Sequence, residues 1–148
     1  MEKTVESVAT ILERELESTI KEWLRRVNMV PELTRITLSD ADRTRHLPKL
    51  FDDLICRLRL AKGSHLPISA AATAHGQIRR EQGYSAAMLV EESRAFEVSA
   101  FGTLHLHQSE LDQNQMLADI MIIADEVDAQ LEEAVRSLME TRPRQPAG

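Results

Sequence analysis

Apolar residues recur at intervals of three and four along most of the chain, which places them on one face of an α-helix. The first run of this kind predicts a single long helix over residues 5–27. Its apolar stripe consists of Val5, Val8, Leu12, Leu16, Ile20, Trp23 and Val27. Pro31 lies at or just beyond the end of this helix, because proline cannot continue a helix without losing a hydrogen bond.

A second helix is expected to begin after Ser39, whose hydroxyl can cap the first turn, with Asp42 three residues further on. Pro48 falls inside this pattern and must kink the helix or split it in two. The apolar stripe consists of Leu47, Leu50, Phe51, Leu54, Ile55, Leu58 and Ala61. Gly63 and Pro67 then indicate a loop.

A Gly-Tyr-Ser corner separates the next two predicted helices. The third helix is short, from about 68 to 82, and its small side chains allow a neighbouring helix to approach closely. Gly83 suits the left-handed position that follows a helix end, and Ser85 suits the N-cap of the fourth helix. The side of the fourth helix that faces the core is expected to carry Leu89, Glu92, Phe96, Ala100 and Thr103.

A turn near 107–111 should separate the fourth helix from the last one, with Ser109 as the new N-cap. The last helix has the most regular stripe: Leu117, Ile120, Ala124, Val127, Leu131, Ala134 and Leu138. This pattern fits an ordinary bundle helix, and it equally fits a helix that pairs with its copy in a homodimer and continues as a signalling coiled coil. We expect residues 142–148 to form a disordered tail.

Together these patterns predict an all-α fold, an antiparallel bundle of about five helices with a long C-terminal helix, forming one domain over residues 1–141. Composition agrees, since aromatic residues make up 3% and glycine and proline number five each. The net charge of −6 argues against a nucleic-acid partner. The lone Cys56 fits a reducing cytoplasm, and the apolar runs are too short for a membrane helix. The glutamate-rich N-terminus lacks the apolar segment of a signal peptide.

Three polar residues are expected to meet inside the hairpin formed by the third and fourth helices. His75 and Arg79 lie one helical turn apart, and Glu92 shares the core-facing side of its helix. A buried carboxylate without a partner is costly, so Glu92 should contact His75, Arg79 or both. The cluster is either a structural clamp or a switch beside a small pocket with Tyr84 at its mouth, which a ligand or proton loosens.

Arg94 points away from Glu92 and is expected to hold the last helix through Asp125 or Glu126. Zinc binding is disfavoured because the five histidines include no pair at helical i,i+4 spacing and no cluster with cysteine. Haem ligation through His75 alone stays open, but three phenylalanines offer little for an apolar haem pocket. The chain contains no glycine-rich phosphate loop, and Cys56 has no adjacent base. We therefore expect no cofactor and no enzymatic activity.

The order His75-Gly-x-x-Arg79, then Gly83-Tyr84-Ser85, then Leu89-Val-Glu-Glu92-x-Arg94 resembles the RsbRD-type N-terminal domain. The stretch from His46-Leu-Pro to Leu54 is also similar to the second helix of that family. Ser93 and Glu97 depart from the family pattern, which often has an aromatic residue and an arginine there. The resemblance implies a helical sensory domain of RsbT co-antagonist proteins or bacterial sensor histidine kinases, with no defined ligand.

The leading functional hypothesis is accordingly a cytoplasmic signal-input domain that acts on a kinase or stressosome output module. The alternative is a histidine phosphotransfer domain with His75 as the phosphoacceptor. Such domains usually show His-x-x-Lys-Gly, whereas Ile78 and Arg79 occupy those two places here. A third hypothesis is a purely structural dimerisation module that binds no ligand.

Overall fold

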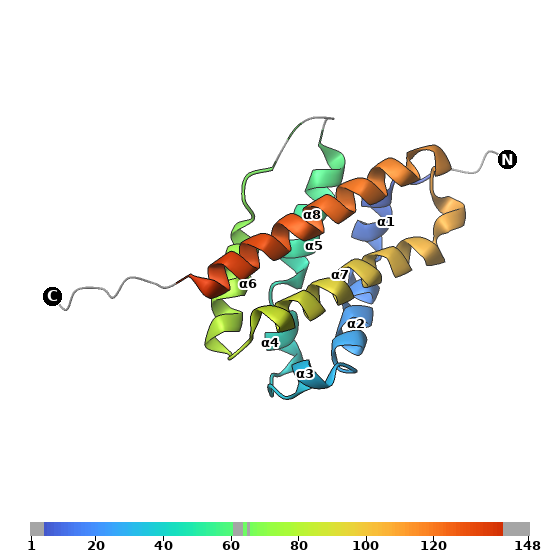
Figure 1. Ribbon diagram of the computed structural model, residues 1–148. Coiled ribbons are helices and arrows are strands. Elements are labelled where there is room, and N and C mark those ends of the chain that lie inside the picture. Colours follow the sequence, from blue (N-terminus) through green and yellow to red (C-terminus); the bar gives the residue numbers. More distant parts are fainter. Residues whose placement is uncertain (1–4, 61–63, 65, 141–148) are drawn as a thin grey trace.

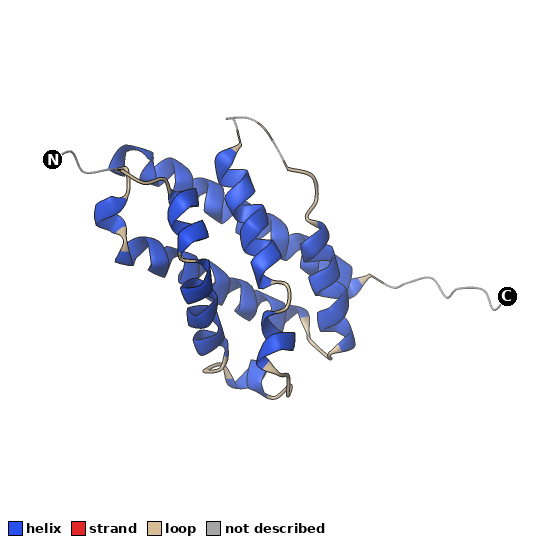
Figure 2. Ribbon diagram, turned by 180° about the vertical axis from the view of Figure 1, so that it is seen from behind, coloured by secondary structure: helices blue, strands red, loops and turns tan. Residues whose placement is uncertain are grey.

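The computed structural model describes residues 5–60, 64 and 66–140, and all regular secondary structure in these ranges is helical (Figures 1 and 2). The α-helices are α1 (Val8–Arg14), α2 (Leu16–Val27), α3 (Pro31–Thr34), α4 (Asp40–Thr44), α5 (Leu47–Arg59), α6 (Ala70–Glu81), α7 (Ala86–Leu106) and α8 (Gln113–Met139). The expected all-α bundle with a long C-terminal helix is confirmed. The predicted tail at 142–148 and the loop residue Gly63 lie outside the described residues.

The predicted single helix over 5–27 is wrong, because the structure has two helices that meet at Glu15. The first begins only after Ser7, whose hydroxyl accepts a hydrogen bond from the amide of Thr10. The backbone of Glu15 leaves the helical region (φ −100°, ψ 22°). Its carbonyl accepts hydrogen bonds from the hydroxyls of Ser18 and Thr19 at 3.0 and 2.7 Å, and such side-chain bonds bend helices.

Pro31 and Pro48 each lie at the start of a helix. Pro31 occupies the first turn of α3, and Pro48 occupies the first turn of α5, where no amide hydrogen is needed. The predicted N-cap at Ser39 is confirmed, since its hydroxyl accepts from the amide of Asp42 at 3.1 Å. The second predicted helix is thus split into α4 and α5, which places Arg43 and His46 close to the break.

The corner between α6 and α7 has the predicted chemistry. Gly83 has φ +93°, and the amides of Gly83 and Tyr84 donate to the carbonyls of Arg80 and Arg79 at 3.1 and 2.9 Å. This pairing is the Schellman motif that ends a helix on a left-handed glycine. Ser85 then caps α7 through the amide of Met88. The third helix begins two residues later than expected, at Ala70, because Ser69 caps it.

The turn predicted at 107–111 is present as a short 3-10 helix, η1 (Gln108–Glu110), but its expected cap is wrong. Asp112 caps α8 through the amide of Asn114 at 3.0 Å, and Ser109 forms part of η1. The apolar stripe predicted for α8 is buried only in part. Val127 and Ala134 are buried in the core of this chain, whereas Leu117 is 72% exposed.

Helix α8 packs against α5, α6 and α7, and α7 lies beside it in the opposite direction (Figure 1). The phenyl rings of Phe51 on α5 and Phe96 on α7 stack with their centroids 4.1 Å apart, near the middle of the core. Helices α6 and α8 approach so closely at Gly76 that a Cβ atom there would overlap the carbonyl oxygen of Ala134. The predicted role of small side chains in α6 is therefore confirmed.

The described chain starts beside the beginning of α8. Glu6 forms an isolated parallel bridge with Leu111, and its amide donates to the carbonyl of Glu110 at 2.7 Å. The other described end follows the last turn of α8, so the two ends lie at opposite poles of the bundle (Figure 1).

Candidate functional site

The polar residues predicted to meet inside the α6–α7 hairpin do so. The Glu92 carboxylate accepts hydrogen bonds from Nε and Nη2 of Arg79, both at 3.0 Å, and lies 3.3 Å from Nε2 of His75. The hydroxyl of Tyr84 donates to the same carboxylate at 3.1 Å. These contacts use all the acceptor positions of the carboxylate, as a buried charge requires. Glu92 therefore contacts both of its predicted partners.

Tyr84 lies inside this cluster, so its predicted place at the mouth of a pocket is wrong. Its side chain is 5% exposed and accepts a hydrogen bond of 2.8 Å from Nη1 of Arg43. The guanidinium of Arg79 also stacks over the Tyr84 ring, 4.7 Å from its centroid. The short side chain of Ser85 faces outward after the turn, whereas the Gly83 corner directs the phenol inward against Glu92.

Arg43 is a buried cation that sequence reasoning missed. Its other hydrogen bonds go to the carbonyls of Ile36 and Leu33, and its own carbonyl accepts a 2.6 Å bond from Arg79. Within the described parts of the chain, no carboxylate lies within ion-pair distance of Arg43. The Tyr84 hydroxyl lies between Arg43 and Glu92. It accepts from the Arg43 guanidinium and donates to the Glu92 carboxylate, which also binds Arg79. A signal existed in the sequence, since Arg43 falls four residues before Leu47 on the apolar stripe.

His46, at the start of α5, extends the cluster towards the surface. Its Nδ1 atom lies 3.2 Å from Nδ1 of His75, and the two rings meet edge to face. A carboxylate only accepts hydrogen bonds, so Nε2 of His75 carries the hydrogen that points to Glu92. The two Nδ1 atoms face each other, so one ring donates this hydrogen bond and the other accepts it.

The surroundings of His46, Glu92 and Tyr84 shift the pKa values of these three side chains. Burial, together with the nearby positive charges of His75 and Arg79, lowers the pKa of His46 to about 4. Burial alone would raise the pKa of Glu92, but the hydrogen bond from His75 and the charge of Arg79 outweigh it and lower that pKa. Burial and the charge of Glu92 raise the pKa of Tyr84 to about 12. The cluster therefore holds an ionised carboxylate beside a neutral phenol at neutral pH.

Arg94 does not have its predicted role. It is exposed and pairs with Glu91, one turn away on the same helix, at 3.4 Å. Asp125 and Glu126, its expected partners on α8, instead face Arg57 of α5 at 3.0 and 3.8 Å. The prediction failed because the outward side of α7 carries Arg94 away from α8. Arg94 is consequently not part of the candidate site.

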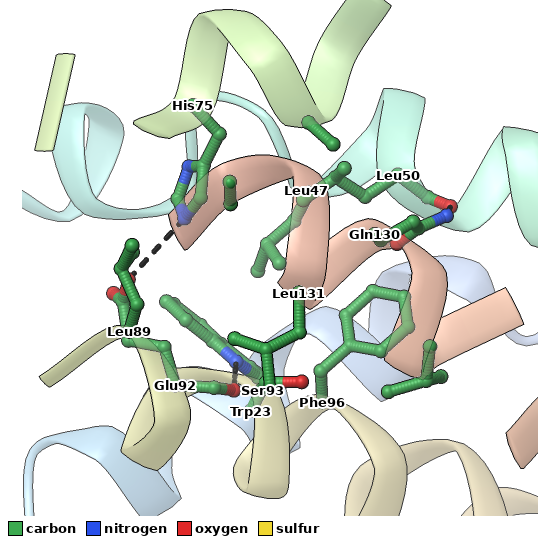
Figure 3. Close-up of a pocket in the computed structure, with 13 residues that line it drawn as sticks. Trp23, Leu47, Leu50, His75, Leu89, Glu92, Ser93, Phe96, Gln130 and Leu131 are labelled. Carbon is green, nitrogen blue, oxygen red and sulfur yellow. Dashed lines mark hydrogen bonds and ion pairs between the residues drawn. The ribbon is translucent and has the colours of Figure 1, made fainter. Parts of the chain in front are cut away.

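A cavity of about 40 Å³ lies next to His75 and Glu92, enclosed by α2, α5, α6, α7 and α8 (Figure 3). It is lined by Trp23, Leu47, Leu50, Ala72, His75, Leu89, Glu92, Ser93, Phe96, Val127, Gln130, Leu131 and Ala134. The indole nitrogen of Trp23 donates to the backbone carbonyl of Glu92 at 3.1 Å. The pocket expected beside the cluster is present, and its half-buried lining residues are Ser93 on α7 and Leu131 on α8.

Among the residues that the structure describes, no three His, Cys, Asp or Glu side chains gather closely enough to hold a metal ion. No described helix combines the length and apolar character needed to cross a membrane. Comparisons of the chain with protein-family models, curated proteins and solved structures found no match.

Proposed function

We propose that the chain is a cytoplasmic signal-input domain of a bacterial signal-transduction protein and has no enzymatic activity of its own. It would pass a rearrangement of the α6–α7 hairpin, or of a homodimer, to a histidine kinase or stressosome output module. The proposal draws on the resemblance to RsbRD-type domains. Four of the residues that carry this resemblance, His75, Arg79, Tyr84 and Glu92, lie together in the buried polar cluster.

The observation that carries the proposal is the close packing of α6 on α8 directly beside the polar cluster. His75 is followed by Gly76, whose backbone packs against the Ala134 carbonyl without an intervening side chain. Nearby, the hydroxyl of Ser137 donates to the carbonyl of Thr73 at 2.7 Å. A displacement of α6 at His75 would therefore be transmitted to the last turns of α8, because close-packed helices do not deform independently.

The phosphotransfer alternative is disfavoured by the surroundings of His75. Its side chain is 8% exposed, and its two ring nitrogens face His46 and Glu92. A phosphoacceptor needs a free nitrogen that a response regulator can reach. Incubation with a phosphorylated response regulator, followed by a search for acid-labile label on His75, tests this alternative directly.

The homodimer in the proposal would use the terminal helix. Leu117 and Met121 lie one turn apart on α8 and are 72% and 65% exposed, which leaves an apolar strip on its first half. Val127 and Ala134 already pack inside the chain, so the second half of the predicted seam is occupied. Analytical ultracentrifugation of the wild-type chain and of Leu117→Glu measures whether this strip joins two copies.

The function is tested by joining the chain to a histidine kinase core after α8 and measuring autophosphorylation. Glu92→Gln, which removes the charge that orders the cluster, should change kinase activity at temperatures where the fusion stays folded. The control is Glu91→Gln, one residue earlier on the outward side of α7. Unchanged activity in both variants would contradict the proposal. A His75→Ala variant with lower stability and normal activity would favour the structural dimerisation module.

A further inference from the structure

The cavity beside the polar cluster lies nearest the surface between α7 and α8. Among its lining residues, Ser93 on α7 and Leu131 on α8 are half-buried, and all the others are buried. Figure 3 shows His75 and Glu92 at one side of the cavity and Gln130 with Leu50 at the other. A molecule entering between α7 and α8 would pass Ser93 and Leu131 and come to rest against the ring of Trp23 or Phe96.

The size of the cavity limits what fits. A water molecule needs roughly 10–15 Å³ measured in this way, so about 40 Å³ corresponds to about three water-sized positions. Most of the lining side chains are aliphatic or aromatic, which favours an apolar body over a string of waters. The occupant is thus a compact molecule of about three non-hydrogen atoms.

The charge of the occupant is also limited. The carboxylate of Glu92 is fully used by His75, Arg79 and Tyr84. The remaining guanidinium nitrogen of Arg79 donates to the side chain of Gln82 at 2.7 Å. An ion in the cavity would lose its hydration without gaining a free counter-charge, which is strongly unfavourable. The occupant must therefore be uncharged.

Two polar atoms of the lining have hydrogen-bonding capacity to spare. The amide nitrogen of Gln130 donates to the carbonyl of Leu50 at 3.0 Å, and this bond leaves the amide oxygen as an acceptor. The hydroxyl of Ser93, at the half-buried edge of the cavity, can both donate and accept a hydrogen bond. A hydroxyl or amide group on the occupant could bond to either atom.

We propose that this cavity is a binding site for a compact uncharged molecule with an apolar body and one hydrogen-bonding group, the chemistry of a short-chain alcohol. The inference rests on the proposed function only in that such a molecule would be the input signal. Its occupancy would press on His75, which contacts Glu92, and on Ala134, whose carbonyl packs against Gly76 of α6.

The test uses the whole chain and four probes: ethanol, acetate, ethylammonium and benzyl alcohol. Trp23 is the only tryptophan, so its fluorescence reports on the cavity directly. Ethanol should give a saturable change in emission, with a dissociation constant of about 1 mM or weaker because so few atoms make contact. Acetate and ethylammonium should give none because they are charged, and benzyl alcohol should give none because it is too large.

Ser93→Leu should fill the mouth and abolish the ethanol response, while Arg94→Leu, its neighbour on the exposed side, should leave the response intact. A nuclear Overhauser effect between the ethanol methyl group and the Trp23 indole in the wild-type chain tests the site without any variant. Absence of both the saturable change and this effect would overturn the inference, as would an unaltered response in folded Ser93→Leu.

The two proposals fail separately. If ethanol binds at Trp23 but Glu92→Gln leaves the kinase fusion unchanged, the binding site stands and the signalling function fails. If the fusion responds to Glu92→Gln but ethanol gives neither fluorescence change nor Overhauser effect, the signalling function stands and the binding site fails.

Discussion

The guanidinium group of Arg79 holds both oxygens of Glu92 at 3.0 Å, and the two side chains are 1% and 3% exposed. The pair spans the corner between α6 and α7 and fixes the register of the two helices. Fork-shaped pairing of this kind is the strongest form of side-chain hydrogen bonding in proteins. Its burial means that neither partner can be removed without leaving an uncompensated charge or an unpaired donor.

Replacing Glu92 with Gln should lower the free energy of unfolding by about 3–5 kcal/mol, because Arg79 would be left as an unpaired buried cation. Urea denaturation followed by circular dichroism measures this loss. Glu91→Gln is the matched control, since its exposed pair with Arg94 should contribute less than about 1 kcal/mol. Equal losses in the two variants would contradict the assignment of Glu92 as the central buried charge.

Alanine substitutions at Gly76 and Gly102 are a second matched pair of variants. Gly76→Ala should destabilise the chain by about 1–3 kcal/mol, because its Cβ would overlap the Ala134 carbonyl and push α6 away from α8. Gly102 lies inside α7 with no atom near a Cβ position, so Gly102→Ala should stabilise it by about 0.4–1 kcal/mol. Thermal unfolding of both variants distinguishes the signs. If Gly76→Ala left the free energy of unfolding unchanged, α6 and α8 could separate without a loss of stability.

His46 gives the chain a pH dependence of known sign. Its pKa falls from 6.5 to about 4 on folding, so between these values the unfolded chain binds a proton that the folded chain does not. Stability contributed by neutral His46 is therefore present above pH 6.5 and is lost as the pH falls towards 4. His46→Gln should make stability less steeply dependent on pH in this window, as measured by denaturation at several pH values. NMR titration of His46 with a midpoint near 6.5 would refute the prediction.

Tyr84 is the only tyrosine, which allows its ionisation to be followed directly by ultraviolet absorption. The folded chain should show a midpoint of about 12, compared with about 10 in denaturant, because the phenol is buried beside Glu92. Tyr84→Phe should cost about 1–3 kcal/mol, since Arg43 would lose an acceptor inside the protein. A folded-state midpoint near 10 would place the hydroxyl in water and contradict the network.

Much of the fold follows from local chemistry that is visible in the sequence. Ser39, Ser85 and Gly83 take the positions that their side chains or backbone freedom predict, and Pro48 divides a helix at its first turn. The break at Glu15 could not be predicted in this way. It depends on side-chain bonds from Ser18 and Thr19 to a carbonyl, and the sequence does not specify whether such hydroxyls bond to the backbone or point to solvent.

The core of the site was predicted from spacing alone, because His75, Arg79 and Glu92 lie on neighbouring helices joined by a short corner. Arg43 and His46 were not, since their approach depends on how α4 and α5 fold back onto this hairpin. Arg94 was misplaced for the same reason. Which side of α7 faces α8 is decided by packing between distant segments, and the periodicity of one helix does not specify it.

The bridge between Glu6 and Leu111 has a geometric consequence for measurements on this chain. It fastens the start of the described chain to the head of α8, which runs on for 27 residues, or about 40 Å at 1.5 Å per residue. Fluorophores attached at Glu6 and Met139 would report on the straightness of that single rod. Any bend in it would shorten their separation and appear as increased energy transfer.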